Sequence, residues 1–251
     1  MGQVGRVLRR FRRARWEPPS VLDEMGAWER QVLAQVKPFT LTNPERIYAL
    51  TEAVSYVVRR GVPGAFAECG VWRGGSVLAM ILALQREGVS DRDIYLYDTF
   101  EGMTKPSDLD TSDFDNPALE QWHKAKRDGG QAWPQWFNEE LFNIDLVKRV
   151  LHETGYPAER VHFVQVTVEQ TIPAQVPERL ALLRLDTDWY ESTRHELIHL
   201  YPLLQSGGVL IIDDYGHWKG CRKAVDEYFA QGQTPVLLNR VDYSCRTMVK
   251  I

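Results

Sequence analysis

The sequence predicts an α/β fold with a mostly parallel sheet that is covered by helices on both faces. From Ala65 onward, short apolar runs alternate with segments of helical periodicity, which is typical of consecutive βαβ units. Two of the runs, residues 180–186 and 207–214, end abruptly in aspartates. Uninterrupted apolar runs indicate strands buried on both faces, and open α/β sheets bind ligands beyond the carboxyl ends of such strands. We therefore expect the functional site at that edge of the sheet.

The composition is that of an ordinary globular protein. The 251 residues are 44% hydrophobic and 25% charged, with a formal net charge of −4. These values fit one large domain, or a domain with an added cap, and give no sign of nucleic-acid binding. The three cysteines are widely spaced and form no C-x-x-C pair, so we expect neither a disulfide framework nor a cysteine metal site. A cytoplasmic location fits this cysteine usage. No run approaches a transmembrane helix in length and no signal peptide is evident, so no stable membrane association is expected.

Two segments precede the first predicted strand. Residues 1–19 are rich in arginine and predict a mobile, solvated arm, with a helix for a membrane surface or an anionic partner as the alternative. Residues 20–63 predict a helical cap. Ser20 is placed to cap a helix that runs to about Val36, and Pro44 stands in the first turn of a second helix.

The main domain, residues 64–251, is expected to hold the sheet. Strands are predicted at Ala65–Cys69, Ile94–Asp98, Val161–Val166, Leu180–Asp186, Val209–Asp213, Val236–Asn239 and Arg246–Lys250. Helices are predicted at Ser76–Glu87, Asn138–Glu153, Ser192–Leu204 and Lys219–Ala230. Only a short turn separates the last two strands, so one of them is expected to be an antiparallel edge strand.

A long connection, residues 99–137, interrupts this alternation after the second strand. It is rich in glycine, proline and acidic residues, and it also carries several large aromatic side chains. Connections of this length are usually functional or disordered, and the aromatic content favours function. We predict a lid over the strand ends, with a short helix near residues 118–126. Its rings could stack on a planar substrate, face a sugar, or form a local core.

The turn after the first strand, Glu68–Ser76, is rich in glycine, which lets the backbone approach a ligand closely. Its spacing is neither G-x-G-x-x-G nor a Walker loop. Glu68 is awkward for a pyrophosphate but suits a ligand with a positive amine, and Asp98 after the second strand suits ribose hydroxyls. An amine and a ribose without phosphate describe S-adenosylmethionine. A dinucleotide, or structural roles for both acids such as a salt bridge to Arg73 or a helix cap, are the alternatives.

Four aspartates follow the fourth and fifth predicted strands: Asp186, Asp188, Asp213 and Asp214. Carboxylates that lie this close repel one another unless a cation lies between them. With no histidine or cysteine at ligand spacing, a hard cation such as Mg²⁺ is favoured over Zn²⁺. Such a metal can hold two substrate oxygens and lower the pKa of a hydroxyl. Asp188 lies beyond the strand end and is the candidate general base.

Other roles are open for the residues around this cluster. Asp188 could instead cap the helix that starts near Ser192, or pair with Arg194. His217, close to the second acid pair, is a rival base because the pKa of histidine lies near neutrality.

Four runs together carry a resemblance to a known family: Glu68–Ser76, Asp98–Met103, Leu185–Thr193 and Gly207–Gly216. They resemble the TylF family of macrocin O-methyltransferases, which includes mycinamicin and novobiocin sugar methyltransferases. The resemblance covers roughly residues 38–251 and leaves the N-terminal arm outside. It implies a class I methyltransferase fold and a Mg²⁺-dependent transfer from S-adenosylmethionine to a hydroxyl, commonly of a deoxysugar on a natural product. It also implies a homodimer.

The resemblance assigns roles residue by residue. Asp186, Asp213 and Asp214 match the metal ligands, and Asp188 matches the proposed base. The positions that match the cofactor site are Glu68, Cys69, Gly70, Val71, Trp72 and Ser76 for the methionine part, Asp98, Thr99 and Gly102 for the ribose, Thr167 and Val168 for the adenine, and Thr40 and Leu41 for a segment that closes over the cofactor.

The acceptor class follows from one difference. Catechol methyltransferases carry a lysine in a D-x-x-K run, whereas the matching segment here, Asp186–Trp189, has none. A sugar hydroxyl is less acidic than a phenol and needs the metal and a neighbouring carboxylate together, so a glycosylated small molecule is the expected acceptor. The alternatives are an O-methyltransferase of a polyketide or phenolic hydroxyl, a glycosyltransferase that uses Asp186-Thr187-Asp188 as a D-x-D motif, and a non-catalytic cofactor-binding module.

Overall fold

The computed structural model describes residues 20–138, 140–232 and 235–251, so the predicted arm at residues 1–19 lies outside it. Its centre is a seven-stranded sheet with the order β3-β2-β1-β4-β5-β7-β6. The strands are β1 (Ala65–Cys69), β2 (Ile94–Asp98), β3 (Val161–Gln165), β4 (Leu180–Leu185), β5 (Leu204–Ile212), β6 (Asn239–Arg240) and β7 (Arg246–Val249). The first five run parallel, and β7 pairs antiparallel with both β5 and β6. The predicted fold class is confirmed.

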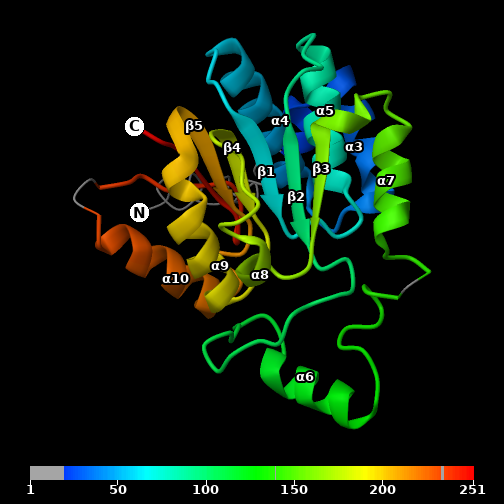
Figure 1. The fold of residues 1–251 in the computed structure, drawn as a ribbon, viewed down its shortest axis with the longest axis vertical. Coiled ribbons are helices and arrows are strands. Elements are labelled where there is room, and N and C mark those ends of the chain that lie inside the picture. Colours follow the sequence, from blue (N-terminus) through cyan, green and yellow to red (C-terminus); the bar gives the residue numbers. More distant parts are fainter. Residues whose placement is uncertain (1–19, 139, 233–234) are drawn as a thin grey trace, which may run out of the picture.

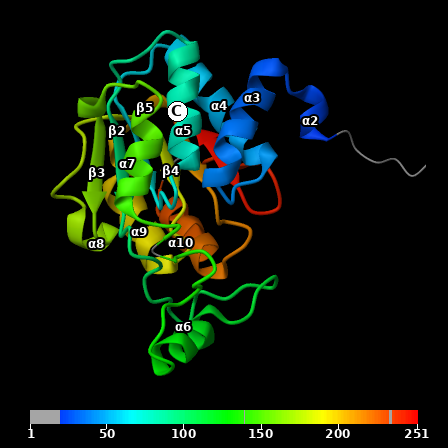
Figure 2. The same ribbon diagram turned by 90° about the vertical axis from the view of Figure 1, so that its right-hand side faces the viewer.

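Helices cover both faces of the sheet, so the molecule has three layers (Figures 1 and 2). One face carries α3 (Ala27–Val36), α4 (Pro44–Arg59), α5 (Gly75–Arg86) and α7 (Ile144–His152). The other carries α8 (Val168–Thr171), α9 (Tyr190–His199) and α10 (Lys219–Ala230). The predicted helical cap therefore shares the buried apolar cluster of α5 and the sheet. Within the described ranges, no helix is long and apolar enough to cross a membrane.

The first predicted helix is interrupted. A short helix, α2 (Val21–Glu24), begins at a capping box formed by Ser20 and Asp23, and Met25 then adopts an extended conformation. The side chain of Arg30 donates to the backbone oxygens of Leu22 at 2.6 Å and Met25 at 3.0 Å. These bonds satisfy carbonyls that the end of α2 leaves without helical partners. The break therefore has a local cause that helical periodicity does not reveal.

Several other boundaries differ from the prediction. Helix α7 begins at Ile144 instead of residue 138, because the side chain of Asn143 caps it by accepting the N–H of Leu146. Helix α9 ends at His199, and a single 3₁₀ turn that contains Pro202 leads into β5, which starts at Leu204. The strand expected at residues 236–239 is reduced to the two residues of β6.

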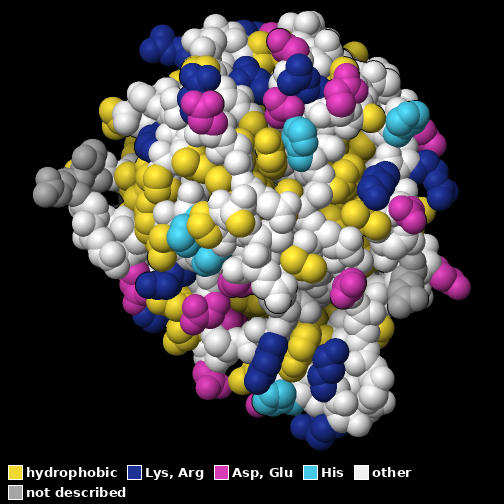
Figure 3. Space-filling view, viewed as in Figure 1, with side chains coloured by type: hydrophobic (Ala, Val, Ile, Leu, Met, Phe, Trp, Pro, Cys, Tyr) yellow, Lys and Arg dark blue, Asp and Glu magenta, His cyan; other side chains and the backbone are white. Residues whose placement is uncertain are grey.

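The long connection extends beyond the carboxyl ends of β2 and β3, with α6 (Ala118–Arg127) at its tip (Figures 1 and 2). Basic side chains lie over this projecting part in the space-filling view (Figure 3), where α6 carries Lys124, Lys126 and Arg127. Helix α6 agrees with the short helix expected near residues 118–126.

Hydrogen bonds tie the connection to the helices on one face of the sheet. The buried carboxylate of Asp110 accepts the N–H of Tyr190 at the start of α9, at 2.7 Å. The N–H of Lys219 at the start of α10 donates to the carbonyl of Thr111 at 2.8 Å. The connection is therefore anchored at two helix N-termini, and it covers the strand ends.

The chain after β1 comes very close to the chain after β4 at Gly70. Its φ is +82°, and a Cβ at this position would overlap the carbonyl oxygen of Asp186. Gly88 has a similar φ of +73° but has open space around its Cβ position.

We expect Gly70→Ala to lower the free energy of unfolding by roughly 3 kcal/mol or more, since backbone strain and steric overlap add. Gly88→Ala is the matched control and should cost about 1–2 kcal/mol from the left-handed conformation alone. Urea denaturation of both variants measures the difference. Equal losses would show that the overlap with Asp186 is relieved without cost.

Candidate active site

The acidic residues meet because of strand register. Glu68 on β1 lies opposite Arg184 on β4, and Arg184 lies opposite Ile211 on β5. Side chains two residues apart point to the same face of a strand, so Asp186 and Asp213 continue these rows on that face. Three strands thus bring acids from distant parts of the sequence to one edge of the sheet, on the side covered by α4.

Arg184 occupies the centre of this arrangement. Its Nη1 lies 2.5 Å from Oε1 of Glu68 and 2.6 Å from Oδ2 of Asp186, and its Nη2 lies 2.7 Å from Oδ1 of Asp213. The side chain is only 2% exposed. Burial opposes the charge, but the carboxylates of Asp186, Asp213 and Glu68 outweigh it and raise the pKa of the guanidinium well above its usual value. Arg184 is therefore a permanent internal counter-ion.

A second arginine reaches the cluster from the helical cap. Arg46 on α4 places its Nη1 2.5 Å from Oδ2 of Asp213 and its Nε 2.8 Å from Oδ2 of Asp242. Asn43 also donates to Asp242, at 2.7 Å. Both oxygens of Asp213 are thus held by guanidinium groups, and the segment before β1 contributes directly to the site.

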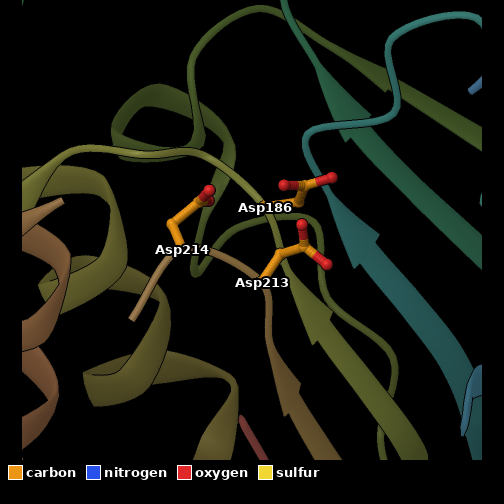
Figure 4. Close-up of side chains that lie close together, drawn as sticks. All are labelled: Asp186, Asp213 and Asp214. Carbon is orange, nitrogen blue, oxygen red and sulfur yellow. The ribbon is translucent and has the colours of Figure 1, made fainter. Parts of the chain in front are cut away.

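Asp186, Asp213 and Asp214 each offer one oxygen, and these atoms lie within 4.8 Å of one another. Figure 4 shows the three carboxylates converging from the ends of β4 and β5. Burial and the neighbouring carboxylate of Asp188 raise the pKa of Asp214 well above its usual value. Among the residues that the structure describes, Asp214 forms no salt bridge. Three oxygen ligands around an uncompensated acid fit Mg²⁺ or a similar hard cation.

Asp188 lies beside this cluster with an unusual backbone conformation, a φ of +65°. Its N–H donates to Oδ2 of Asp214 at 3.2 Å, and its Oδ1 accepts the indole N–H of Trp218 at 2.6 Å. Loss of solvent and the negative charge of Asp186 raise the pKa of Asp188 to about 8. The sequence left open that Asp188 caps α9. In the structure the side chain of Asp110 accepts the first N–H of that helix instead.

His217 also lines the cavity, but both of its ring nitrogens are engaged. Nδ1 lies 2.9 Å from the hydroxyl of Tyr243, and Nε2 lies 3.1 Å from Oδ2 of Asp115 in the long connection. The ring therefore bridges the lid and the β6–β7 turn, an arrangement that suits a structural contact better than proton transfer.

The turn after β1 is organised by Asp98. Its Oδ2 accepts the N–H groups of Val71 at 2.7 Å and Trp72 at 2.9 Å, and its Oδ1 accepts the N–H of Phe100 at 2.7 Å. The ends of β1 and β2 are thus joined by a charged acceptor, and this fixes the glycine-rich turn beside the cavity.

One cavity of about 380 Å³ is lined both by the glycine-rich turn after β1 and by the aspartates after β4 and β5. The predicted site residues that line it are Thr40, Leu41, Gly70, Val71, Trp72, Ser76, Asp98, Thr99, Gly102, Thr167, Val168, Asp186, Asp188, Asp213 and Asp214. Glu68 and Cys69 do not line it and are fully buried. Burial raises the pKa of Glu68 to about 8, and its carboxylate faces Arg184, whereas the sequence led us to expect an amine of the cofactor.

Sequence reasoning missed three residues that the structure places in the site: Arg46, Arg184 and Trp218. A signal for Arg184 was present, because a charged residue inside an apolar strand buried on both faces requires partners. Arg46 lies in the polar first turns of a helix and Trp218 in a turn, where nothing in the local pattern indicates what they contact.

The strand order, the glycine turn beside Asp98 and the carboxylates beyond β4 and β5 define a class: an S-adenosylmethionine-dependent O-methyltransferase with the class I fold. The sequence model of one family, described as macrocin O-methyltransferase (TylF), matches residues 28–250. The chain belongs to this TylF family, so the enzyme class and the resemblance seen in the sequence are confirmed. Membership decides against the glycosyltransferase alternative.

Similar proteins agree with this placement. A mycinamicin III 3''-O-methyltransferase from Micromonospora griseorubida is 34% identical over 189 residues, which cover 75% of this chain and 69% of that protein. A demethyldecarbamoylnovobiocin O-methyltransferase from Streptomyces niveus is 31% identical over 192 residues, covering 76% and 68%. The solved structure of the O-methyltransferase NovP aligns with a TM-score of 0.70 at 29% identity, covering 84% of this chain and 82% of NovP.

We expect Arg184→Met to lower the free energy of unfolding by roughly 3–5 kcal/mol, because it removes the counter-ion shared by Glu68, Asp186 and Asp213 and leaves only Asp213 with a partner, Arg46. The double variant Glu68→Gln/Arg184→Met should recover part of this loss, since it removes one of the stranded charges. Arg59→Met is the control, because Arg59 pairs with Glu87 at the surface and its side chain is 68% exposed. That change should cost about 1 kcal/mol or less. Urea denaturation checks all three, and equal losses for Arg184→Met and Arg59→Met would contradict the role of Arg184.

Proposed function

We propose that the protein transfers a methyl group from S-adenosylmethionine to a hydroxyl of a deoxysugar on a natural product, such as a macrolide or another glycosylated metabolite, and that it requires Mg²⁺. The observation that carries the proposal is the convergence of Asp186, Asp213 and Asp214 within 4.8 Å, beside Asp188, in the cavity that also holds the glycine turn. The names of the relatives, which modify mycinamicin III and a novobiocin precursor, support the acceptor class.

The chain offers a place for each reactant. Asp186, Asp213 and Asp214 would hold the cation, which supplies binding positions for two neighbouring hydroxyls and lowers the pKa of the reacting one. The ends of β1, β2 and β3 would hold S-adenosylmethionine, whose sulfonium supplies the methyl group that becomes the methyl ether, with S-adenosylhomocysteine as the second product.

Asp188 is the proposed general base. Trp218 occupies its Oδ1, so Oδ2 is the oxygen that can receive the hydroxyl proton. The low solvent exposure and nearby negative charge that raise its pKa also make its carboxylate a stronger base once it is ionised. The carboxylate of Asp188 would serve as the base in a segment that lacks the lysine of catechol methyltransferases. This difference favours a sugar hydroxyl over a phenol as the acceptor.

The lid and the cap enclose the acceptor end of the cavity. Trp133, Trp136 and Phe137 from the lid line it, and aromatic faces suit the apolar faces of a sugar ring. A homodimer is proposed from the family resemblance. A cytoplasmic location is proposed from the cysteine usage, and Cys69, Cys221 and Cys245 are free and buried in the structure.

The reaction can be tested with labelled S-adenosylmethionine and a panel of glycosylated acceptors that includes mycinamicin III and demethyldecarbamoylnovobiocin. We expect methyl transfer to at least one acceptor, its loss in EDTA, and its recovery on addition of Mg²⁺, because the acid cluster needs a cation to bind hydroxyl oxygens. Full turnover in EDTA would overturn the metal requirement. Failure to bind S-adenosylhomocysteine in calorimetry would overturn the proposal as a whole.

The base assignment is tested with Asp188→Asn. We expect kcat to fall by about 10²- to 10⁴-fold, the usual contribution of a positioned general base. Calorimetry should show that affinities for S-adenosylhomocysteine and for Mn²⁺, used in place of Mg²⁺, are retained. Asp226→Asn on the exposed side of α10 is the control and should leave kcat unchanged. Wild-type turnover by Asp188→Asn would exclude Asp188 as the base.

A further inference from the structure

The turn that carries Asp188 is held in a conformation that non-glycine residues rarely adopt. Asp188 has a φ of +65°, and such strain persists only where surrounding contacts over-determine it. The main chain is fixed by the bond from the N–H of Asp188 to Asp214 and by a bond from the N–H of Trp189 to the carbonyl of Thr187 at 2.7 Å. The hydroxyl of Thr187 also donates to the buried Glu196, at 2.9 Å.

These contacts fix the backbone of Asp188, and its carboxylate needs a constraint of its own. The indole Nε1 of Trp218 supplies that constraint, at 2.6 Å from Oδ1. An indole N–H donates and never accepts, so it cannot exchange a proton with the carboxylate and can only orient it.

Trp218 is itself held in place. It is 7% exposed, and its backbone N–H donates to the carbonyl of Asp214 at 3.0 Å. Its ring meets that of Trp189 edge-on, with centroids 5.0 Å apart. His217 packs edge-on against the same ring, at 4.9 Å. These contacts hold the ring with its indole N–H directed at Asp188.

We propose that Trp218 is a positioning residue for the methyl transfer: its indole N–H holds Oδ1 of Asp188, so that Oδ2 faces the acceptor hydroxyl. This inference rests on the proposed function, in which Asp188 is the base. Trp189, which is also buried, does not share this role, because its Nε1 donates at 3.1 Å to the carbonyl of Thr104 in the lid.

A kinetic test uses Trp218→Phe, Asp188→Asn and the double variant, with the best acceptor from the panel above. Trp218→Phe keeps an aromatic ring and removes the donor, so kcat should fall about 10- to 100-fold, the loss expected for one hydrogen bond to a charged group. KM for S-adenosylmethionine should stay unchanged. The double variant should be no slower than Asp188→Asn, because the bond has no function without the base.

Tyr156→Phe supplies the control for these kinetics, because it also removes a buried donor and keeps an aromatic ring, but its hydroxyl donates to the carbonyl of Arg92 at 2.6 Å outside the cavity. Any effect of this variant should multiply with that of Asp188→Asn. If the losses of kcat in Trp218→Phe and Asp188→Asn also multiplied in the double variant, the inference would be overturned. An unchanged kcat in Trp218→Phe would overturn it too. The base assignment would survive both of these results. An unchanged kcat in Asp188→Asn would instead remove the base assignment itself.

A second measurement needs no acceptor. The chain has 8 tryptophans, and in ¹⁵N-tryptophan-labelled full-length protein the indole resonance that disappears in Trp218→Phe belongs to Trp218. We expect that resonance to move upfield in Asp188→Ala, which removes its carboxylate acceptor. It should keep its position in Asp226→Ala, which removes an exposed carboxylate that accepts the hydroxyl of Tyr215. A Trp218 resonance that does not move in Asp188→Ala would overturn the inference, whether or not the variant is active.

Discussion

The site depends on one buried guanidinium, that of Arg184. Its two terminal nitrogens contact carboxylates from β1, β4 and β5, so a single charge joins the three central strands at their carboxyl ends. Buried ion pairs seldom stabilise a fold more than apolar residues of the same size would. Their retention here is explained by what they position: Asp186 and Asp213 are held beneath the cavity in one orientation, with Arg184 behind them.

Arginine side chains hold the acids in place, and the same acids line the cavity. Arg184 holds Asp213 from the protein interior and Arg46 holds it from the wall of the cavity, while Asp214 has no salt bridge among the described residues. This division gives the proposed cation a place that the arginines do not fill. It also explains why the helical cap is part of the site, since Arg46 comes from α4, ahead of the first strand.

The cavity is completed by segments that have no regular secondary structure. Asp98 draws the turn after β1 toward the end of β2, and the lid is anchored through Asp110 to the start of α9. On the opposite side, Trp218 contacts Asp188 from the turn between β5 and α10. Polar and aromatic contacts thus fix the loops, whereas apolar packing fixes the helices and strands.

The fold class, the parallel strands and the aspartates at their ends could all be predicted from the sequence, because apolar runs and turn residues are local signals that tertiary contacts here did not override. The sequence also indicated the family through short motifs. The break after α2 and the late start of α7 depended on single side chains, Arg30 and Asn143, that cap neighbouring turns. No sequence pattern indicates that Glu68 faces Arg184, that Arg46 contacts Asp213 or that Trp218 contacts Asp188. The reason is physical: these contacts join residues between 30 and 167 positions apart, and register and packing, not local pattern, bring them together.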